Sequence, residues 1–282
     1  MRDGTRIPTD RFPVLANNEY AVEDVNKFDQ LARTPSKAAT LTEATGGHPE
    51  RSARFRNLLT PAGLGPELRS AFVADDSTWG ALILVRRAGH PEFEQREVEL
   101  VGAASSLFAR AVRRGLIAET CDSSSTDLPE APGVVELDAS GDPARMSSTA
   151  EPLLAELSGS TVEAGLLSAP IHALATASRA AIARGPRATA PALPALTLRT
   201  PAGSWLVLHG GLLGDARSGR VAVFIQRAHP TLVAPLLLKA YGLTAREQQV
   251  AQLALRGATT AQAAQRLTIS PRPRPLDLAS ER

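Results

Sequence analysis

The stretch LTAREQQV at residues 243–250, continued by GATTAQAAQRLTIS at residues 257–270, carries the most regular pattern in the chain. Thr244 stands three residues before Glu247, which is the spacing of a capping box. In that motif the hydroxyl accepts a free helix N–H, and the carboxylate accepts the N–H of the cap residue. The stretch therefore predicts a helix that begins just after Thr244.

A second helix start follows in the same stretch. Thr259 and Gln262 repeat the capping-box spacing, and Gly257 suits the end of the preceding helix, where a positive φ is needed. Ser270 and Pro271 indicate a third start, because a cap residue precedes a proline at the first helical position. Two short helices, a glycine turn between them and a third start are the layout of a helix-turn-helix.

This layout resembles the DNA-binding domain of LuxR-type bacterial transcription regulators. The residues that carry the resemblance are Leu243, Thr244, Arg246, Glu247, Val250, Gly257, Thr259, Thr260, Ala264, Leu267, Ile269, Ser270 and Pro271. The resemblance implies a regulator that binds DNA as a dimer on paired half-sites, about one helical turn apart. It also implies that six residues lie at or near DNA phosphates, namely Arg246, Arg256, Thr259, Thr260, Ser270 and Arg272.

The match ends at Pro271, where the family continues with its recognition helix. Here the chain reads RPRPLDLASER at residues 272–282. Pro275 falls where a helix needs a backbone N–H, at a cost of ~3 kcal/mol or more, and Arg272 and Arg274 each precede a proline, which disfavours helical φ and ψ. We expect the recognition helix to be lost after residue 271. Any DNA binding would then be weak, salt-sensitive and largely independent of sequence.

Two explanations of this C-terminal tail remain open. In the first, the reading frame of a GC-rich gene has shifted after Pro271, and the alternation of arginine and proline fits such a shift. In the second, the tail is genuine and the DNA-binding unit is degenerate. The second explanation favours an alternative function, in which the chain is a ligand sensor, or a dimerisation partner of an intact regulator, that no longer binds DNA.

The composition is that of a chain with packed domains. The 282 residues are 43% hydrophobic, and the net charge is only +2. From Pro230 onward there are seven basic and three acidic side chains, whereas the rest of the chain is slightly acidic. A basic end suits contact with phosphates. A single cysteine, Cys121, excludes an internal disulfide, and no apolar run approaches a membrane span. We expect a cytoplasmic protein with no membrane segment.

The first part of the chain resembles a GAF-like sensor domain over residues 20–118. The resemblance rests on four sequence segments, PAGLG at 61–65, ELR at 67–69, WGAL at 79–82 and the stretch 93–100. We expect residues 1–20 to be poorly ordered. The expected elements are helices at 21–33, 50–59 and 91–117, and strands at 67–74 and 79–86 joined by a turn at 75–78. The long helix either pairs with its copy in a homodimer or covers only its own sheet.

Residues 119–132 read as a linker, and residues 133–228 resemble a PAS-like sensor domain. The predicted strands are 134–138, 196–200, 204–210 and 220–227, with helices at 147–157 and 171–183 and a loose segment at 184–194. A connecting helix at 229–242 then leads into residues 243–282. The fold class we expect is α+β sensor domains followed by a partial all-α helix-turn-helix, sensing an unknown small molecule or protein.

No pattern in the chain indicates an enzyme. The five histidines never stand at metal-ligand spacing, and zinc would lack cysteine partners. His209, Gly210 and Gly211 resemble an esterase oxyanion loop, but no G-x-S-x-G nucleophile motif accompanies them, and a strand end followed by a glycine turn explains them better. We expect no catalytic residue, no metal and no cofactor.

Overall fold

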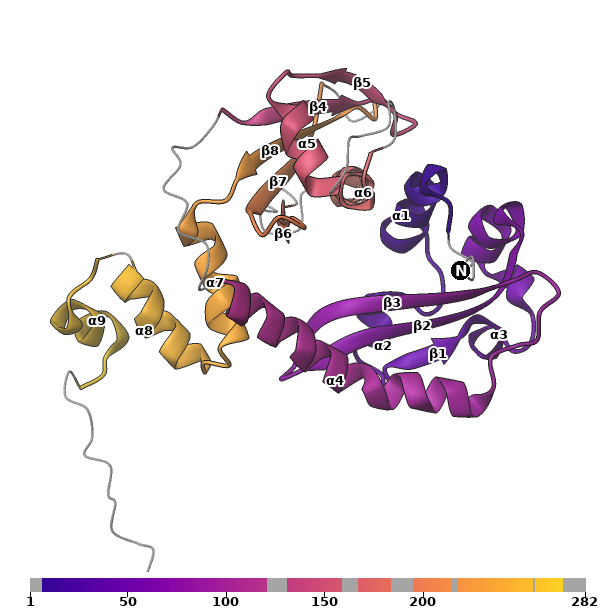
Figure 1. Ribbon diagram of the computed structural model, residues 1–282, viewed down its shortest axis with the longest axis horizontal. Coiled ribbons are helices and arrows are strands. Elements are labelled where there is room, and N and C mark those ends of the chain that lie inside the picture. The colour runs from indigo at the N-terminus through magenta and orange to yellow at the C-terminus, as the bar shows by residue number, and fades with distance from the viewer. Residues whose placement is uncertain are drawn as a thin grey trace, which may run out of the picture. The chain divides into compact units, whose positions relative to one another are not determined.

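A computed structural model of the chain describes residues 7–120, 131–158, 167–183, 195–214, 218–255 and 257–270. Two compact units make up the chain, Met1–Ala228 and His229–Arg282. The first contains two antiparallel sheets with helices, and in the second the described residues form helices only (Figure 1). This mixture of helices and antiparallel sheets confirms the α+β prediction.

The first sheet has three strands in the order β1-β2-β3. They are β1 (Ala38–Thr40), β2 (Leu64–Ala74) and β3 (Ser77–Arg87). The predicted hairpin is confirmed, and Asp75 and Asp76 form its turn with φ of 50° and 54°. Two consecutive positive φ angles are what a tight hairpin turn needs, and aspartate tolerates them better than most residues. Strand β1 is too short to have been recognised in the sequence.

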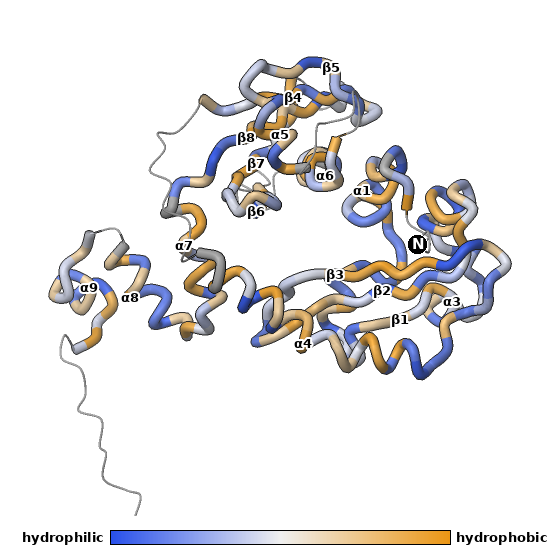
Figure 2. The backbone as a smooth tube through the Cα atoms, in the orientation of Figure 1, coloured by the Kyte–Doolittle hydropathy of each residue, from blue (hydrophilic) through white to orange (hydrophobic). Residues whose placement is uncertain are grey.

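The long helix α4 (Gln95–Thr120) lies along one face of this sheet (Figure 1). Leu68 of β2 packs with Val98 of the helix in a buried cluster, and the rings of Phe72 and Phe108 stack with centroids 4.9 Å apart. The predicted long helix is therefore confirmed, and its apolar residues come in short stretches between hydrophilic ones (Figure 2). Such spacing buries one side of the helix and leaves another exposed.

The opposite face of the sheet carries buried charges. Glu67 and Arg69 alternate with Leu68 on β2, so they point away from α4. The Glu67 carboxylate lies 2.8 Å from Nη2 of Arg54, and Arg69 donates to Glu19 at 2.8 Å. Arg54, Glu67 and Arg69 are each only 1% exposed. Burying charges is costly unless they are paired, and here each guanidinium has a carboxylate beside it.

The N-terminal expectations were wrong in two places. Residues 12–20 are not poorly ordered but form helix α1 (Phe12–Tyr20), which packs against helix α6 of the same unit. The helix predicted at 21–33 shrinks to a single turn, α2 (Phe28–Leu31). The Asp24 carboxylate explains this, because it accepts the backbone N–H groups of Val25 and Arg54 and holds the chain in a loop.

The helix predicted at residues 50–59 is also interrupted. The segment consists of the 3₁₀ turn η2 (Pro49–Arg51), the π-helical turn η3 (Phe55–Leu59) and the 3₁₀ turn η4 (Thr60–Ala62). Between them Ser52 is extended, with φ −71° and ψ 131°, and its hydroxyl donates to Asp24 at 2.8 Å. A tertiary hydrogen bond therefore replaces continuous helix here.

The second sheet has five antiparallel strands in the order β5-β4-β8-β7-β6. The strands are β4 (Gly133–Leu137), β5 (Pro143–Met146), β6 (Ala195–Arg199), β7 (Trp205–Leu212) and β8 (Val221–Arg227), accompanied by helices α5 (Ala150–Ser158) and α6 (Ala169–Ala183). Ile171 and Leu174 of α6 pack on Leu208 and Val223 of the sheet. The predicted strands and helices of this part are confirmed, and β5 is an addition. Most of the expected linker, residues 121–130, and the segment 184–194 lie outside the described residues.

The glycines after His209 do not form the expected turn. Strand β7 continues through them to Leu212, and Gly210 pairs with Val223 of β8. A Cβ on Gly210 would lie 2.4 Å from Oγ of Ser178 on α6. Glycine is present because the helix passes too close for a side chain, which accounts for this motif without an oxyanion loop.

Candidate nucleic-acid interface

The second unit contains three described helices. They are α7 (Pro230–Ala240), α8 (Ala245–Leu255) and α9 (Thr260–Leu267). Contacts join α7 to α8 and α8 to α9, and the buried apolar residues of the described part of this unit are one valine and three alanines, namely Val233, Ala240, Ala263 and Ala264. Val250 and Ile269 remain more than a third exposed. The described helices therefore share a thin core.

The start of α8 has the hydrogen bonds of a capping box. The backbone N–H of Thr244 donates to the Glu247 carboxylate at 2.8 Å, and the Thr244 hydroxyl donates to it at 2.7 Å. In return, the Glu247 N–H donates to the Thr244 hydroxyl at 3.3 Å. These hydrogen bonds, first that of the side chain and then that of the backbone, lower the pKa of Glu247 below its ordinary value of 4.5. The first helix start predicted from the sequence is confirmed.

We expect acid to weaken this cap. Because the pKa of Glu247 is lower in the folded chain, its contribution to stability is present above pH ~4.5 and is lost as the pH falls through the folded pKa. The order of the first turn of α8 should decline in that window. NMR shifts of the Thr244 and Glu247 amides would report it, with Glu247→Gln as the control that no longer titrates. A Glu247 carboxyl that titrates at or above its ordinary value would contradict this prediction.

The turn between the helices and the start of α9 also have the expected geometry. Gly257 has φ 78°, and the N–H of Ala258 donates to Leu253 O at 2.9 Å, which closes α8 in a glycine cap. The Thr259 N–H donates to the Gln262 amide oxygen at 2.9 Å, and the Gln262 N–H returns a bond of 3.3 Å to the Thr259 hydroxyl. The second capping box is therefore confirmed.

Arg246 links the two helices. Its Nη1 donates to the Gln249 side chain at 2.9 Å, and its Nη2 donates to the carbonyl oxygen of Leu267 at the end of α9. A cation near the C-terminal carbonyls of a helix is favourable, because those groups lack partners and carry partial negative charge. The guanidinium is exposed, so it remains accessible to a ligand while it holds α8 against α9.

The six residues expected at phosphates separate into groups. Thr259 and Thr260 are exposed at the start of α9, and Arg246 and Ser270 are exposed near its other end, about 12 Å away for a helix of this length. Arg256 and Arg272 lie outside the described residues, as does the expected loss of the recognition helix after residue 271.

One basic side chain of this surface was missed in the sequence. Arg266 is exposed in the last turn of α9, four residues after Gln262 and seven after Thr259. That spacing places the three residues on one side of the helix. The signal for it in the sequence is a basic residue inside the second predicted helix, three to four residues from polar ones.

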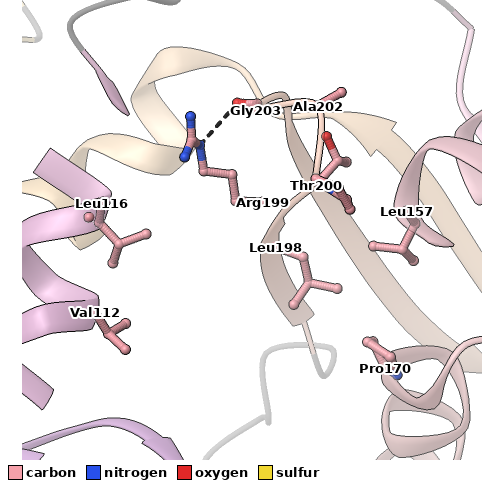
Figure 3. Close-up of a pocket in the computed structure, with 11 residues that line it drawn as sticks. Val112, Leu116, Leu157, Pro170, Leu198, Arg199, Thr200, Ala202 and Gly203 are labelled. Atoms are coloured by element: carbon pink, nitrogen blue, oxygen red, sulfur yellow. Dashed lines mark hydrogen bonds between the residues drawn. The ribbon is translucent and has the colours of Figure 1, made fainter. Parts of the chain in front are cut away.

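The first unit contains open cavities that are candidate ligand sites. One, of ≈ 760 Å³, is lined by Val112 and Leu116 of α4 and by the turn after β6, where Nε of Arg199 donates to Gly203 O at 3.1 Å (Figure 3). The stick view shows mainly apolar side chains around it, and its dashed line marks the hydrogen bond from Arg199 to Gly203. This cavity has volume but few polar groups that would select a ligand.

Neither a metal centre nor a membrane span emerges from the part of the chain that the structure describes. The histidine and carboxylate side chains of these residues form no group of three that would hold a metal ion. None of the helices in the same residues is both long and apolar enough to cross a membrane. No protein-family model, curated protein or solved structure matches this chain.

Proposed function

We propose that the chain is a transcription regulator of the LuxR type that binds DNA through residues 243–282. The GAF-like residues 20–118 and the PAS-like residues 133–228 serve as its sensor domains. The observation that carries the proposal is the pair of capping boxes on either side of the Gly257 turn, since these define two short helices with exposed polar starts. The proposal includes no catalytic role.

The proposed contacts with DNA are electrostatic. The N-terminus of α9 presents backbone N–H groups and a partial positive charge beside the exposed hydroxyls of Thr259 and Thr260, which suits a phosphate. Arg246 and Arg266 add charge along and beyond the same helix. Contacts of this kind position a protein on DNA without reading its bases, so they supply affinity but little specificity.

Anisotropy titrations of full-length protein with labelled 30-base-pair duplexes test this function. We expect dissociation constants of about 10⁻⁶–10⁻⁴ M that depend little on sequence and weaken strongly from 50 to 200 mM salt. Arg266→Ala should weaken binding. It should also reduce, by about one, the magnitude of the slope of the logarithm of the binding constant against the logarithm of the salt concentration. Arg145→Ala, an exposed change on β5, is the matched control. A nanomolar complex with one defined sequence would contradict the degenerate interface, and no binding at low salt would favour the alternative.

That alternative is a sensor or dimerisation partner without DNA binding. The observation that favours it is a pair of exposed apolar side chains two helical turns apart on one side of α4, Leu100 at 70% and Leu107 at 62% exposure. Apolar side chains concentrated on one helix are typical of an interaction surface. We propose a homodimer through α4, which also suits a regulator that binds paired half-sites.

Analytical ultracentrifugation of the full chain tests the dimer. We expect the wild type to sediment as a dimer at micromolar concentration and Leu107→Glu to sediment as a monomer, because a charge would be buried in the apolar contact. Met146→Glu is the matched control, since Met146 is 46% exposed on a different element. A monomeric wild type, or a Leu107→Glu dimer of unchanged strength, would argue against this surface.

A further inference from the structure

The first sheet ends on one side at β3, and the outer edge of this strand has no partner strand among the described residues (Figure 1). Between Ser77 and Arg86, the backbone of β3 forms no hydrogen bond with any described segment other than β2. An edge of this kind carries a row of free N–H and C=O groups, which is a template for a further strand.

The pairing of the sheet shows which residues of β3 point their backbone groups outward. On β2, the N–H of Ala71 donates to Lys37 O at 2.9 Å, which lies on the β1 side. Successive residues of an antiparallel strand bond to alternate sides, so Ser70 of β2 bonds to β3, and its partner Leu82 bonds inward. The residues that present N–H and C=O groups at the free edge are therefore Ala81, Ile83 and Val85.

The middle of β3 lacks the features that usually protect an edge strand. Residues 79–85 read WGALILV, without a charge or a proline, and their register with β2 is regular from Gly80 to Val85. Natural edge strands commonly carry lysine, proline or a bulge at such positions, because these prevent pairing with another chain. Ala81 is exposed, and the side chains from Leu82 to Val85 are half-buried. The strand is therefore apolar, regular and accessible.

Helix α4 covers one face of the sheet and leaves this edge open. Ser105 of the helix donates to Ala71 O of β2 at 2.7 Å, and Gly102 lies against the backbone of Ser36, just before β1. This part of the helix is therefore placed over β1 and β2, away from the free edge. A further strand would lie in the plane of the sheet, ~4.8 Å from β3, so it would not displace the helix.

Opposite charges flank the apolar centre of β3. Asp76 stands in the turn just before the strand and Arg87 is its last residue, and both are exposed without an ion pair among the described residues. Their neighbours Asp75 and Arg86 already pair with residues of α4. The N-terminal end of an antiparallel partner lies beside Arg87, and its C-terminal end lies beside Asp76. Cross-strand charges therefore favour a partner that begins with acidic residues and ends with basic ones.

We propose that the free edge of β3 binds an extended segment of another protein, which joins the sheet as a fourth, antiparallel strand. The segment has about seven β-forming residues without proline, an acidic N-terminal end and a basic C-terminal end. Hydrogen bonds to the backbone of Ala81, Ile83 and Val85 supply the affinity, and the charges at the two ends set the direction. The proposal depends neither on DNA binding nor on a dimer through α4.

Anisotropy titrations of a labelled peptide, EETVTVTVTKK, with the full chain test the proposal. We expect a dissociation constant of about 10⁻⁵–10⁻⁴ M, because a short segment loses much of its binding energy to ordering. The peptide EETVTPTVTKK, with a central proline, should bind at least about tenfold more weakly, since it lacks one backbone donor and resists the extended form. The charge-reversed KKTVTVTVTEE should also bind more weakly. No binding up to about 1 mM peptide, or equal affinity for all three, would overturn the proposal.

Amide hydrogen exchange, read by NMR, then locates the binding. The peptide should slow exchange at Ala81, Ile83 and Val85, whose N–H groups face outward, and leave Leu82 and Leu84 unchanged, because theirs already bond to β2. Protection without this alternation would overturn the assignment of the edge. The same alternating protection in the chain alone, growing with its concentration, would show that a second copy occupies the edge and would overturn a foreign partner.

Two variants separate the edge from the rest of the chain. Ala81→Pro removes an outward N–H and keeps the bonds to β2, so peptide binding should fall at least about tenfold. Arg87→Glu reverses one flanking charge and serves as the second variant should Ala81→Pro fail to fold. It should weaken EETVTVTVTKK by a few-fold. Arg145→Ala, on β5, should change nothing. Unchanged binding by folded Ala81→Pro protein, or by Arg87→Glu protein, would overturn the proposal.

Discussion

Replacing Glu67 by glutamine should lower the free energy of unfolding by about 3–5 kcal/mol, the usual loss when one partner of a buried ion pair is removed. Glutamine has nearly the same shape as glutamate, so the change in stability reports the loss of the negative charge. Glu67 accepts from Nε of Arg54 at 2.9 Å and lies 4.0 Å from Nε of Arg69. Both guanidiniums are 1% exposed and stay charged, so the change removes the carboxylate closest to Arg54 and leaves Asp24 at 3.5 Å and Glu19 at 2.8 Å as the remaining charged partners.

Urea denaturation followed by circular dichroism measures this loss, with Glu97→Gln as the matched control. Glu97 also pairs with an arginine, Arg86, at 2.7 Å, but its side chain is 35% exposed. Partly exposed pairs contribute about 0–1 kcal/mol, so the control should change little. An equal and small loss of unfolding free energy in both variants would contradict this prediction. It would show that Asp24 and Glu19 alone are enough to balance the charges of Arg54 and Arg69.

The second large effect concerns two glycines on one helix. Gly102 and Gly115 both lie within α4, where a change from glycine to alanine ordinarily stabilises by about 0.5–1 kcal/mol. A Cβ on Gly102 would lie 2.4 Å from the backbone oxygen of Ser36, whereas a Cβ on Gly115 would meet nothing within 4 Å. We expect Gly102→Ala to destabilise by about 1–3 kcal/mol through overpacking, and Gly115→Ala to stabilise.

Thermal unfolding of the two variants beside the wild type checks the sign of each change. Both variants replace glycine by alanine in the same helix, so both gain the same helix propensity. The difference between their changes in stability therefore reports the close approach of Ser36 to α4. Two increases in melting temperature would show that the segment before β1 moves away at little cost. Two decreases would show that Gly115 is needed for a contact outside the described residues.

Local patterns in the sequence determined much of the fold. The hairpin at Asp75 and Asp76 follows from residues that accept positive φ between two β-rich runs. The capping boxes at Thr244 and Thr259 close within three residues, so no distant group is needed to form them. Helix α4 and the strands of the second sheet were likewise recognised from their own periodicity. The resemblance to a LuxR-type regulator, which rests on the same short patterns, stays a prediction.

Proline proved a weaker guide than expected. Helix α7 continues through Pro235, so proline alone does not end a helix in this chain. The expected loss of helix at Pro275 therefore stays a prediction about residues that the structure does not describe. The physical reason is that a missing N–H and a ring clash cost a few kcal/mol, which packing of an apolar helix can offset.

Only the tertiary structure decided which residues meet over long distances. In the sequence, Glu67 and Arg69 look like the solvent side of a half-buried strand. In the fold they are buried, because Arg54 and Glu19 approach from 13 and 50 residues away. The same holds for Arg246, whose bond to Leu267 O crosses two helices. Caps and turns are decided by neighbours along the chain, whereas paired charges and cavity walls depend on chain segments that only folding brings together.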